Sequence, residues 1–380
     1  MSQPLSHYLV NSSFETFVYR SGVNLKASYK AYEVLLRQGV RFIDMDIWDG
    51  DSDEGPLIPC VCKKGGLGAA VEKLKLDKVL QTIHENAFES SEYPVIISLN
   101  VQCDLENQKA TARLFKEIFG ENLLTEQVDP DEEELPSPEA LKRKIILMAP
   151  EEKEQEEGVD SHDESSLGTL KSQLMTTRTE SGKSIKPQRN VSKGQARELQ
   201  QLMVYCKSKK GQLTADQVET TNGYLRLRSE SANKGIAGFI YEKELCGSFQ
   251  HVTSTPEDQL IGQLVPLNRG SYEKYHRSIL SQVHPQSRGS YNPLPFWSSG
   301  AQLVSQNLAE LGPMLQINNA MFASNGRCGY VLKPEAQTSC IVSLKILEAR
   351  HLFSTKTDDF LIPHIQVNMY LDTFLVRQDV

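Results

Sequence analysis

The sequence predicts an α/β fold built around a parallel sheet, on the pattern of its first 150 residues. GVRFIDMDIWDGD from Gly39 alternates apolar and acidic residues, which is typical of a strand with one face buried. YPVIISLNV from Tyr93 is continuously apolar and β-rich, as in a strand buried on both faces. A helix is indicated next by apolar residues at helical spacing, namely Leu114, Phe115, Ile118 and Phe119. Strands that alternate with crossover helices form a parallel sheet, and periodicity leaves open whether it is an open sheet or a closed barrel.

Shorter signals complete this half of the chain. Ser28 can cap a helix that Gly39 would end just before the acidic strand. PLIPCV from Pro56 precedes a second amphipathic helix, and KIILM from Lys144 closes the segment with another apolar run.

Beyond residue 150 the pattern changes twice. Residues 151–197 begin with EEKEQEEG and contain too little apolar sequence to fold, so we expect a disordered linker. Strand-like segments recur over residues 198–335, interrupted by a weak stretch that resembles an insertion and by SYNPLPFW, which we interpret as an aromatic-rich turn. Residues 336–380 alternate as strands without helices, and two or three strands are too few for a stable sheet domain.

Composition excludes several classes of protein. A net charge of −8 and a pI near 5.6 speak against nucleic-acid binding. The absence of a run of 18 apolar residues and of a signal pattern predicts a soluble, cytoplasmic protein without a transmembrane segment. Seven cysteines without a CxxC pair argue for reduced thiols, with Cys60 and Cys62 forming only a CxC.

The acidic strand holds the first candidate site. Its alternation places Asp44 and Asp46 on the same face of an otherwise apolar segment. Two like charges this close are costly in a buried setting unless a cation or a shared proton lies between them. The plain alternative is a solvated edge strand.

Seven motifs then follow one another along the chain: PLSHYLVNSS, RFIDMDIWDGD, SEYPVIISL, LPSPEALKRKIIL, ELQQLMVYCKS, SYNPLPFW and GRCGYVLKP. Their order resembles that of the eukaryotic phosphoinositide-specific phospholipase C family. The resemblance implies a distorted (β/α)8 barrel of the TIM type, with halves at 1–150 and 198–335, followed at 336–380 by the first strands of a C2-type β-sandwich. It also implies hydrolysis of phosphatidylinositol 4,5-bisphosphate to diacylglycerol and inositol trisphosphate.

The positions that carry catalysis in this family are altered. The family's SSHNTY is SSFETF here, so Phe14 occupies the first catalytic histidine position, and Cys60 occupies the second. Positions that bind the headgroup in the family are also changed, at Met148, Pro150, Gln282 and His284. Of the substrate-binding positions only a serine, matched to Ser254, is kept.

These departures predict a protein that keeps the barrel, has lost the hydrolase activity, and acts by binding a phosphoinositide membrane surface or a signalling protein. The alternative is a divergent active phospholipase C, with Cys60 as the acid and Glu15 or Asp44 as the base. A third interpretation is a fragment or a decayed gene product, which the incomplete C2-type tail favours. Peripheral membrane association is compatible with the first two.

The resemblance also implies a calcium site. The family's ligand set of one amide and three carboxylates corresponds to Glu15, Asp44, Asp46 and Asn100, with the amide moved from the first position to the last. Calcium accepts six to eight oxygens in a flexible shell, so we expect weak calcium binding. For the acidic linker we expect repulsion of anionic membranes from the barrel mouth, against the alternative of a plain solvated tether.

Overall fold

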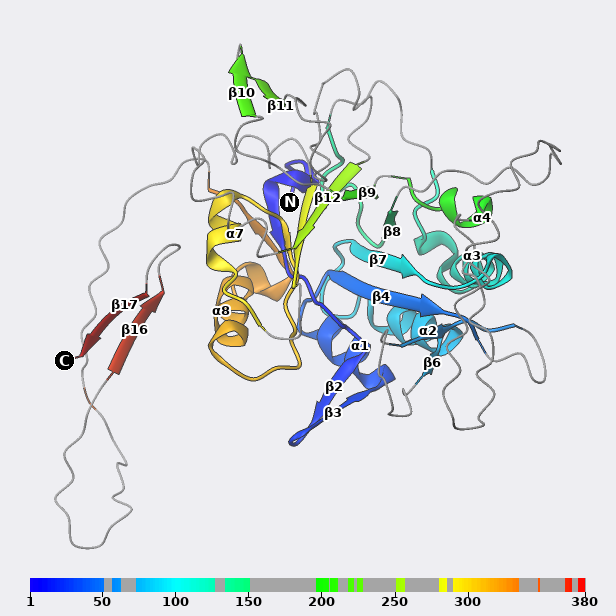
Figure 1. Cartoon of the computed structure of the whole chain (residues 1–380), viewed down its shortest axis with the longest axis horizontal. Coiled ribbons are helices and arrows are strands. Elements are labelled where there is room, and N and C mark those ends of the chain that lie inside the picture. The colour runs from blue at the N-terminus through cyan, green and yellow to red at the C-terminus, as the bar shows by residue number, and fades with distance from the viewer. Residues whose placement is uncertain are drawn as a thin grey trace, which may run out of the picture.

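The computed structural model describes the chain in segments (Figure 1). They are residues 1–50, 57–62, 73–126, 134–150, 196–204, 206–210, 218–221, 224–227, 251–256, 280–285, 290–334, 348, 366–370 and 375–379. Nearly all of the predicted linker and most of the predicted C2-type tail lie outside these residues. Among the helices that the structure describes, none is long and apolar enough to cross a membrane.

A nine-stranded mixed sheet forms the centre of the described chain. Its parallel strands are, in spatial order, β4 (Phe42–Trp48), β7 (Val95–Val101), β8 (Ile145–Pro150), β9 (Cys206–Lys210), β12 (His251–Pro256), β13 (Leu280–His284) and β14 (Leu303–Val304). Two short antiparallel strands, β5 (Cys60–Val61) and β6 (Leu74–Lys75), extend the sheet beyond β4. The predicted parallel sheet is therefore confirmed, and both of the strands predicted around the acidic and the apolar motif belong to it.

The two ends of the parallel array meet at the segment that follows Val10. Ser12 makes an isolated parallel bridge to Phe42 of β4, and Ser13 makes one to Gln306, which lies just beyond β14. Backbone bonds from Ser13 N to the Phe42 carbonyl (3.0 Å) and from Phe14 N to the Gln306 carbonyl (2.8 Å) support these bridges. No continuous ladder of backbone hydrogen bonds closes the described sheet into a barrel. The prediction of a (β/α)8 barrel is therefore confirmed only in part.

Helices cover the sheet. They are α1 (Tyr29–Arg37), α2 (Leu76–Asn86), α3 (Leu105–Phe119), α4 (Arg197–Gln200), α7 (Leu294–Ser299) and α8 (Pro313–Phe322), with 3-10 turns at Leu5–His7, Gly120–Asn122 and Asn325–Arg327. In Figure 1, α2 and α3 lie on the opposite side of the molecule from α7 and α8. The predicted helix start is confirmed, because the Ser28 hydroxyl accepts a bond from Lys30 N, and Gly39 follows the helix with a positive φ of 87°.

One expectation was wrong. SYNPLPFW is not a turn alone, because α7 begins within it and buries Phe296 and Trp297. Pro295 in the first turn costs no helical hydrogen bond there, and the aromatic rings pack against apolar residues of β13 and β14. Tertiary packing therefore makes a helix from a segment whose prolines indicated a turn.

Alternating residues of β4 enter two different hydrophobic cores. Ile43, Met45 and Ile47 pack in one core with residues of α1, α2 and α3. Phe42 lies in a second core on the other face, with Ile96, Ile146, Met148, Leu280 and Leu303 from the neighbouring strands. Asp44 and Asp46 share the face of Phe42, as the sequence alternation predicts.

Four two-stranded sheets surround this centre in the described chain. They pair β1 (Tyr8–Val10) with β15 (Tyr330–Leu332), β2 (Val18–Ser21) with β3 (Asn24–Ala27), β10 (Val218–Thr221) with β11 (Tyr224–Leu227), and β16 (Gln366–Tyr370) with β17 (Leu375–Asp379). The last pair agrees with the predicted alternation of strands in the tail. One hairpin does not define a C2-type sandwich, which stays a prediction.

The first and last thirds of the chain are joined by buried polar bonds as well as by β1 and β15. The Ser91 hydroxyl donates to the Cys328 carbonyl at 2.8 Å, and the Tyr330 hydroxyl donates to the Pro94 carbonyl at 2.9 Å. Gly39 and Gly329 touch so closely that a Cβ on Gly329 would lie 2.1 Å from the Gly39 carbonyl oxygen. A side chain at either position would therefore push the two segments apart.

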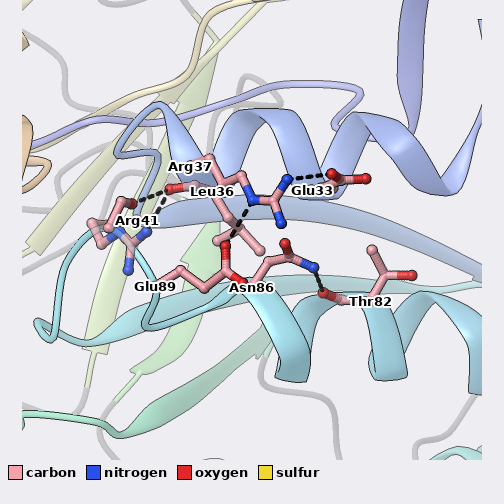
Figure 2. A network of polar contacts seen from close by, with 8 residues as sticks. Glu33, Leu36, Arg37, Arg41, Thr82, Asn86 and Glu89 are labelled. Carbon is pink, nitrogen blue, oxygen red and sulfur yellow. Dashed lines mark hydrogen bonds and ion pairs between the residues drawn. The ribbon is translucent and has the colours of Figure 1, made fainter.

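Arg41, just before β4, is fully buried and has no carboxylate partner among its hydrogen bonds in the described chain. Its guanidinium donates to the carbonyls of Leu36 (2.8 Å), Ala87 and Ser91 (3.2 Å). Burial lowers the pKa of Arg41 to about 10, which still leaves it charged at neutral pH. Figure 2 shows Arg41 beside the end of α1, and shows the exposed Arg37 between Glu33 and Glu89.

We predict that Arg41→Met lowers the free energy of unfolding by about 2–5 kcal/mol, because buried carbonyls lose their donor while the methionine stem still fills the space. Arg37→Met is the matched control, since that guanidinium is exposed and its ion pairs lie in water, and it should change stability little. Urea denaturation of both variants measures this. Equal losses in the two would contradict the role given to Arg41.

Candidate site at the carboxyl edge of the sheet

The carboxyl ends of the parallel strands bring the predicted site residues to one edge. Asp46 lies near the end of β4 and is paired in register with Asn100 near the end of β7. His284 ends β13. Phe14 and Glu15 follow the segment that bridges β4 and β14. This is the edge at which barrel-type folds place their active sites, because the loops that follow the strands converge there.

A set of hydroxyls fixes the segment that carries Phe14 and Glu15 to β4. The Ser13 and Thr16 hydroxyl oxygens are 2.6 Å apart, and the Ser13 hydroxyl also donates to the Phe42 carbonyl. Thr16 Oγ1 accepts a hydrogen bond from Asp44 N at 3.0 Å. Sequence reasoning missed Thr16, although it stands inside the SSFETF motif.

Asp44 is the electrostatically unusual group of this edge. Burial, and then the charge of Asp46, raise the pKa of Asp44 well above its usual value. Burial raises the pKa of Tyr32, and the charges of Asp44 and Asp46 raise it further. The raised pKa of Asp44 has the direction expected for two half-buried carboxylates on one face, and the cation or shared proton between them stays a prediction.

The carboxylate of Asp46, two residues after Asp44, already accepts a hydrogen bond. Asn100 Nδ2 donates to Asp46 Oδ1 at 2.8 Å, and Gln102 Nε2 donates to Asn100 Oδ1 at 2.9 Å. The amide oxygen that the calcium prediction needs is therefore engaged with Gln102. Glu15 is buried with a positive φ of 49°, a backbone conformation that is strained for glutamate.

The predicted calcium ligands are only partly brought together. Asp44, Asp46 and Asn100 occupy adjacent strands, with Asp46 bonded to Asn100. Within the part of the chain that the structure describes, no group of three or more His, Cys, Asp and Glu side chains could hold a metal ion. Glu15, Asp44 and Asp46 do not form such a group in the described chain, and the calcium site stays a prediction.

The two positions that the resemblance implies to be catalytic in the family, Phe14 and Cys60, lie at the same edge. Phe14 is partly buried, and its N–H is held by the Gln306 carbonyl. Cys60 is paired in register with Trp48 at the end of β4, is 4% exposed, and donates from its thiol to the Asp49 carbonyl at 3.2 Å. Neither side chain presents an imidazole or an ammonium group to this edge.

The positions that the resemblance implies to bind the headgroup in the family differ in burial. Met148 is 1% exposed and lies in the second core, paired in register with Ser98. Gln282 is buried on β13, and His284 Nδ1 lies 3.2 Å from the Pro285 carbonyl. Pro150 is the last residue of β8, and Ser254 of β12 is paired in register with Gln282. Pro150 and Ser254 are therefore located in the sheet by their strand positions alone.

Two further polar residues at this edge were not predicted. Gln306 is 2% exposed, and neither its side-chain oxygen nor its nitrogen has a hydrogen-bond partner in the described chain. The hydroxyl of Ser305 is likewise without a partner there. The run QLVSQN shows polar residues within an apolar strand pattern, which was the available signal.

Comparison with known proteins assigns the chain to one family. Residues 1–150 match the family model of the phosphatidylinositol-specific phospholipase C X domain, and residues 226–336 match that of its Y domain. The chain belongs to the phosphoinositide-specific phospholipase C family. The resemblance noted in the motifs is thereby confirmed.

The similar proteins include one that is named as inactive and one that is named as an enzyme. Human "Inactive phospholipase C-like protein 1" is 30% identical over 88% of this chain and 27% of that protein. Rat "1-phosphatidylinositol 4,5-bisphosphate phosphodiesterase delta-1" is also 30% identical, over 88% of this chain and 41% of that protein. The crystal structure of S. officinalis PLC21 superposes with a TM-score of 0.62 at 23% identity, over 88% of this chain and 38% of that one, and shows a shared fold. The chain thus spans well under half the length of these proteins.

We predict that Asp44→Asn raises the melting temperature, and that the gain over the wild type grows with pH. A carboxyl whose pKa is raised on folding costs no stability below its unfolded pKa of about 4, and costs progressively more as pH rises toward its folded pKa. At neutral pH the gain should be a few degrees, as about 1 kcal/mol would give. Melting curves from pH 4 upward measure it, with the exposed Glu85→Gln as a control expected to show no such trend. A gain in melting temperature that does not change with pH would contradict the raised pKa of Asp44.

Proposed function

We propose that this chain is a phospholipase C-like protein that has lost hydrolysis and acts by binding. The observation that carries the proposal is the chemistry of Phe14 and Cys60, which stand where the family resemblance places its two catalytic histidines. Phosphodiester cleavage requires a proton to leave the attacking hydroxyl, a proton to reach the leaving oxygen, and charge stabilisation at phosphorus. Phe14 supplies none of these.

Cys60 is a poor substitute for the second histidine. A thiol with a pKa near 8.5 is a weaker proton donor than an imidazolium. Its proton is also directed to the Asp49 carbonyl, and the sulfur is almost fully buried. Loss of a positioned acid or base costs about 10²–10⁴ in rate, and loss of an electrostatic donor about 10²–10³. The two losses together leave a rate lower by several orders of magnitude.

One observation favours the alternative, a divergent active phospholipase C. The raised pKa of Asp44 is a property of catalytic acids and bases, and perturbed carboxyl groups cluster at active sites. A hydrolase built on Asp44 or Glu15 would still need positive charge to stabilise a phosphoryl transition state. None of the described side chains at the predicted site positions is Lys or Arg.

The same charge argument bears on the partner. Anionic headgroups are bound through Arg and Lys, and carboxylates at this edge repel them. We therefore place a signalling protein ahead of a phosphoinositide membrane surface as the partner of this edge. A cytoplasmic location, with peripheral membrane association through the partner, is part of the proposal.

We predict that the protein releases no inositol phosphate from vesicles that contain phosphatidylinositol 4,5-bisphosphate. Restoring the histidines together, in Phe14→His with Cys60→His, should produce activity from a background of none if the wild type is inactive. The double variant is needed because residues that act as a unit contribute non-additively.

Release of inositol phosphate by the wild type within tenfold of rat phospholipase C delta-1, assayed in parallel, would overturn the proposal. If the variant only alters an activity that is already present, the divergent hydrolase is correct. Vesicle co-sedimentation with and without the anionic lipid separates the lipid partner from the protein partner, and is informative whether or not hydrolysis occurs.

For calcium we predict binding with a dissociation constant of about 10⁻³ M, at the weak end for calcium sites. The ion must compete with the Asn100 bond to Asp46 and with the proton favoured on Asp44, and both reduce affinity. Calorimetry on the wild type and on Asp46→Asn tests this, with heat expected only in the wild type. No heat in either protein at millimolar calcium would show that the site does not bind the ion.

A further inference from the structure

The hairpin of β2 and β3 is a surface feature to which the proposed function gives no role. It forms a two-stranded sheet of its own, and in Figure 1 it extends away from the central sheet, beside α1. Val18, its first residue, donates its N–H to the Glu15 carbonyl at 2.9 Å. Arg20 Nε donates to the Ala309 carbonyl at 2.6 Å, in the segment before α8. The hairpin therefore stands directly beside the candidate site.

The turn of the hairpin fixes the hydrogen-bond pattern of its strands. Gly22 and Val23 form a two-residue turn between Ser21 and Asn24, which are paired in register. A positive φ of 63° at Gly22, with none at Val23, is typical of a type II′ turn with glycine at its first central position. A pair of residues that exchange hydrogen bonds closes such a turn, and pairs of the two kinds alternate along the strands from there.

The alternation leaves backbone groups of β3 at the outer edge of the hairpin. Counted from the turn, Leu25 with Arg20 and Ala27 with Val18 are the pairs that do not bond to each other. The N–H and C=O of these residues point away from the partner strand, as the bond from Val18 to Glu15 illustrates on β2. No backbone group elsewhere in the described chain bonds to Leu25 or Ala27. The edge of β3 can therefore accept another strand.

The side chains of the hairpin are apolar at its tip and basic along its length. Val23 is 89% exposed and Leu25 is 48% exposed. Lys26 is exposed on β3, and Arg20 lies on β2. No Asp or Glu occurs in residues 16–32, although the whole chain has a net charge of −8. The hairpin therefore attracts a partner that is acidic.

We propose that the outer edge of β3 accepts an extended, acidic segment of a partner protein as a third strand. The segment bonds to the outward backbone groups of Leu25 and Ala27, packs apolar side chains on Leu25, and places its carboxylates near Lys26. This inference rests on the proposed function, because it takes a protein as the partner. It adds the place at which that protein docks and the form in which it binds.

Two other occupants fit the hairpin less well. An anionic membrane is attracted by the same basic residues, but hydrocarbon cannot satisfy the N–H and C=O groups of an open strand edge. A second copy of the chain could pair its β3 with this one, but it would place Lys26 and Arg20 close to their own counterparts, and like charges on paired strands are destabilising. An acidic strand satisfies both the backbone and the charge.

The experiment adds a capped peptide of alternating valine and glutamate to the full chain at millimolar concentration, and measures amide hydrogen exchange by NMR. Because backbone and charge supply the recognition, such a peptide should suffice. We expect exchange at Leu25 and Ala27 to slow at least about threefold. A peptide of the same length with lysine in place of glutamate should have no effect.

Two pairs of variants test the backbone and the charge separately. Leu25→Pro removes the outward N–H without removing a bond between β2 and β3, and should abolish the effect, whereas Leu25→Val keeps the N–H and should bind. Lys26→Glu should raise the peptide concentration needed for half of the effect at least about threefold. Its matched control is Lys78→Glu, an equal charge change at an exposed position of α2, which should leave the concentration unchanged. If Leu25→Pro fails to fold, the charge pair still decides.

Three results would overturn the inference. They are unchanged exchange at Leu25 and Ala27 with the valine–glutamate peptide, equal slowing with the lysine peptide, and equal weakening by Lys26→Glu and Lys78→Glu. Slower exchange on vesicles that contain phosphatidylserine, without an effect of the peptide, would replace strand addition by membrane docking. Release of inositol phosphate is measured separately, so the loss of hydrolysis and the strand addition can fail independently.

Discussion

The hydrogen bonds of the buried Arg41 guanidinium are the interaction on which the placement of β4 depends. Through β4 they also affect the carboxyl edge of the sheet, where the candidate site lies. It binds the carbonyls at the ends of α1 and α2 and at the turn before β7, so one side chain sets where two helices stop and where β4 starts. A buried arginine is tolerated here because hydrogen bonds replace water around it. Because Arg41 anchors the start of β4, the strand carries Asp44 and Asp46 on its opposite face, toward the carboxyl edge of the sheet.

The edge is assembled from segments far apart in the chain. The segment after Val10 touches β4 through Phe42 and the chain beyond β14 through Gln306, and buried bonds from Ser91 and Tyr330 hold the same two regions together at the opposite end. Any function of the edge therefore requires both regions to be docked. This dependence on long-range contacts also explains why the site cannot be understood from the first 150 residues alone.

The chemistry left at the edge differs from that implied by the family. The polar residues at the predicted site positions are Glu15, Asp44, Asp46, Cys60, Asn100, Ser254, Gln282 and His284, and the resemblance implies that Phe14, Met148 and Gln282 stand where the family stabilises negative charge on a phosphate. Under the proposed function, such a site suits hydrogen bonding to a partner better than phosphoryl chemistry.

The sequence by itself determined the parallel sheet, the two faces of β4, the cap at Ser28 and the membership of the family, because these depend on local periodicity and on residue identity. Tertiary structure alone decided that α7 forms within a proline-rich segment, that Asn100 bonds Asp46 instead of leaving its oxygen free, and that Glu15 does not join Asp44 and Asp46 in one cluster. It also decided the roles of Thr16, Gln306 and Arg41. Each of these depends on contacts between segments distant in sequence, and no local pattern encodes the distance between two such side chains.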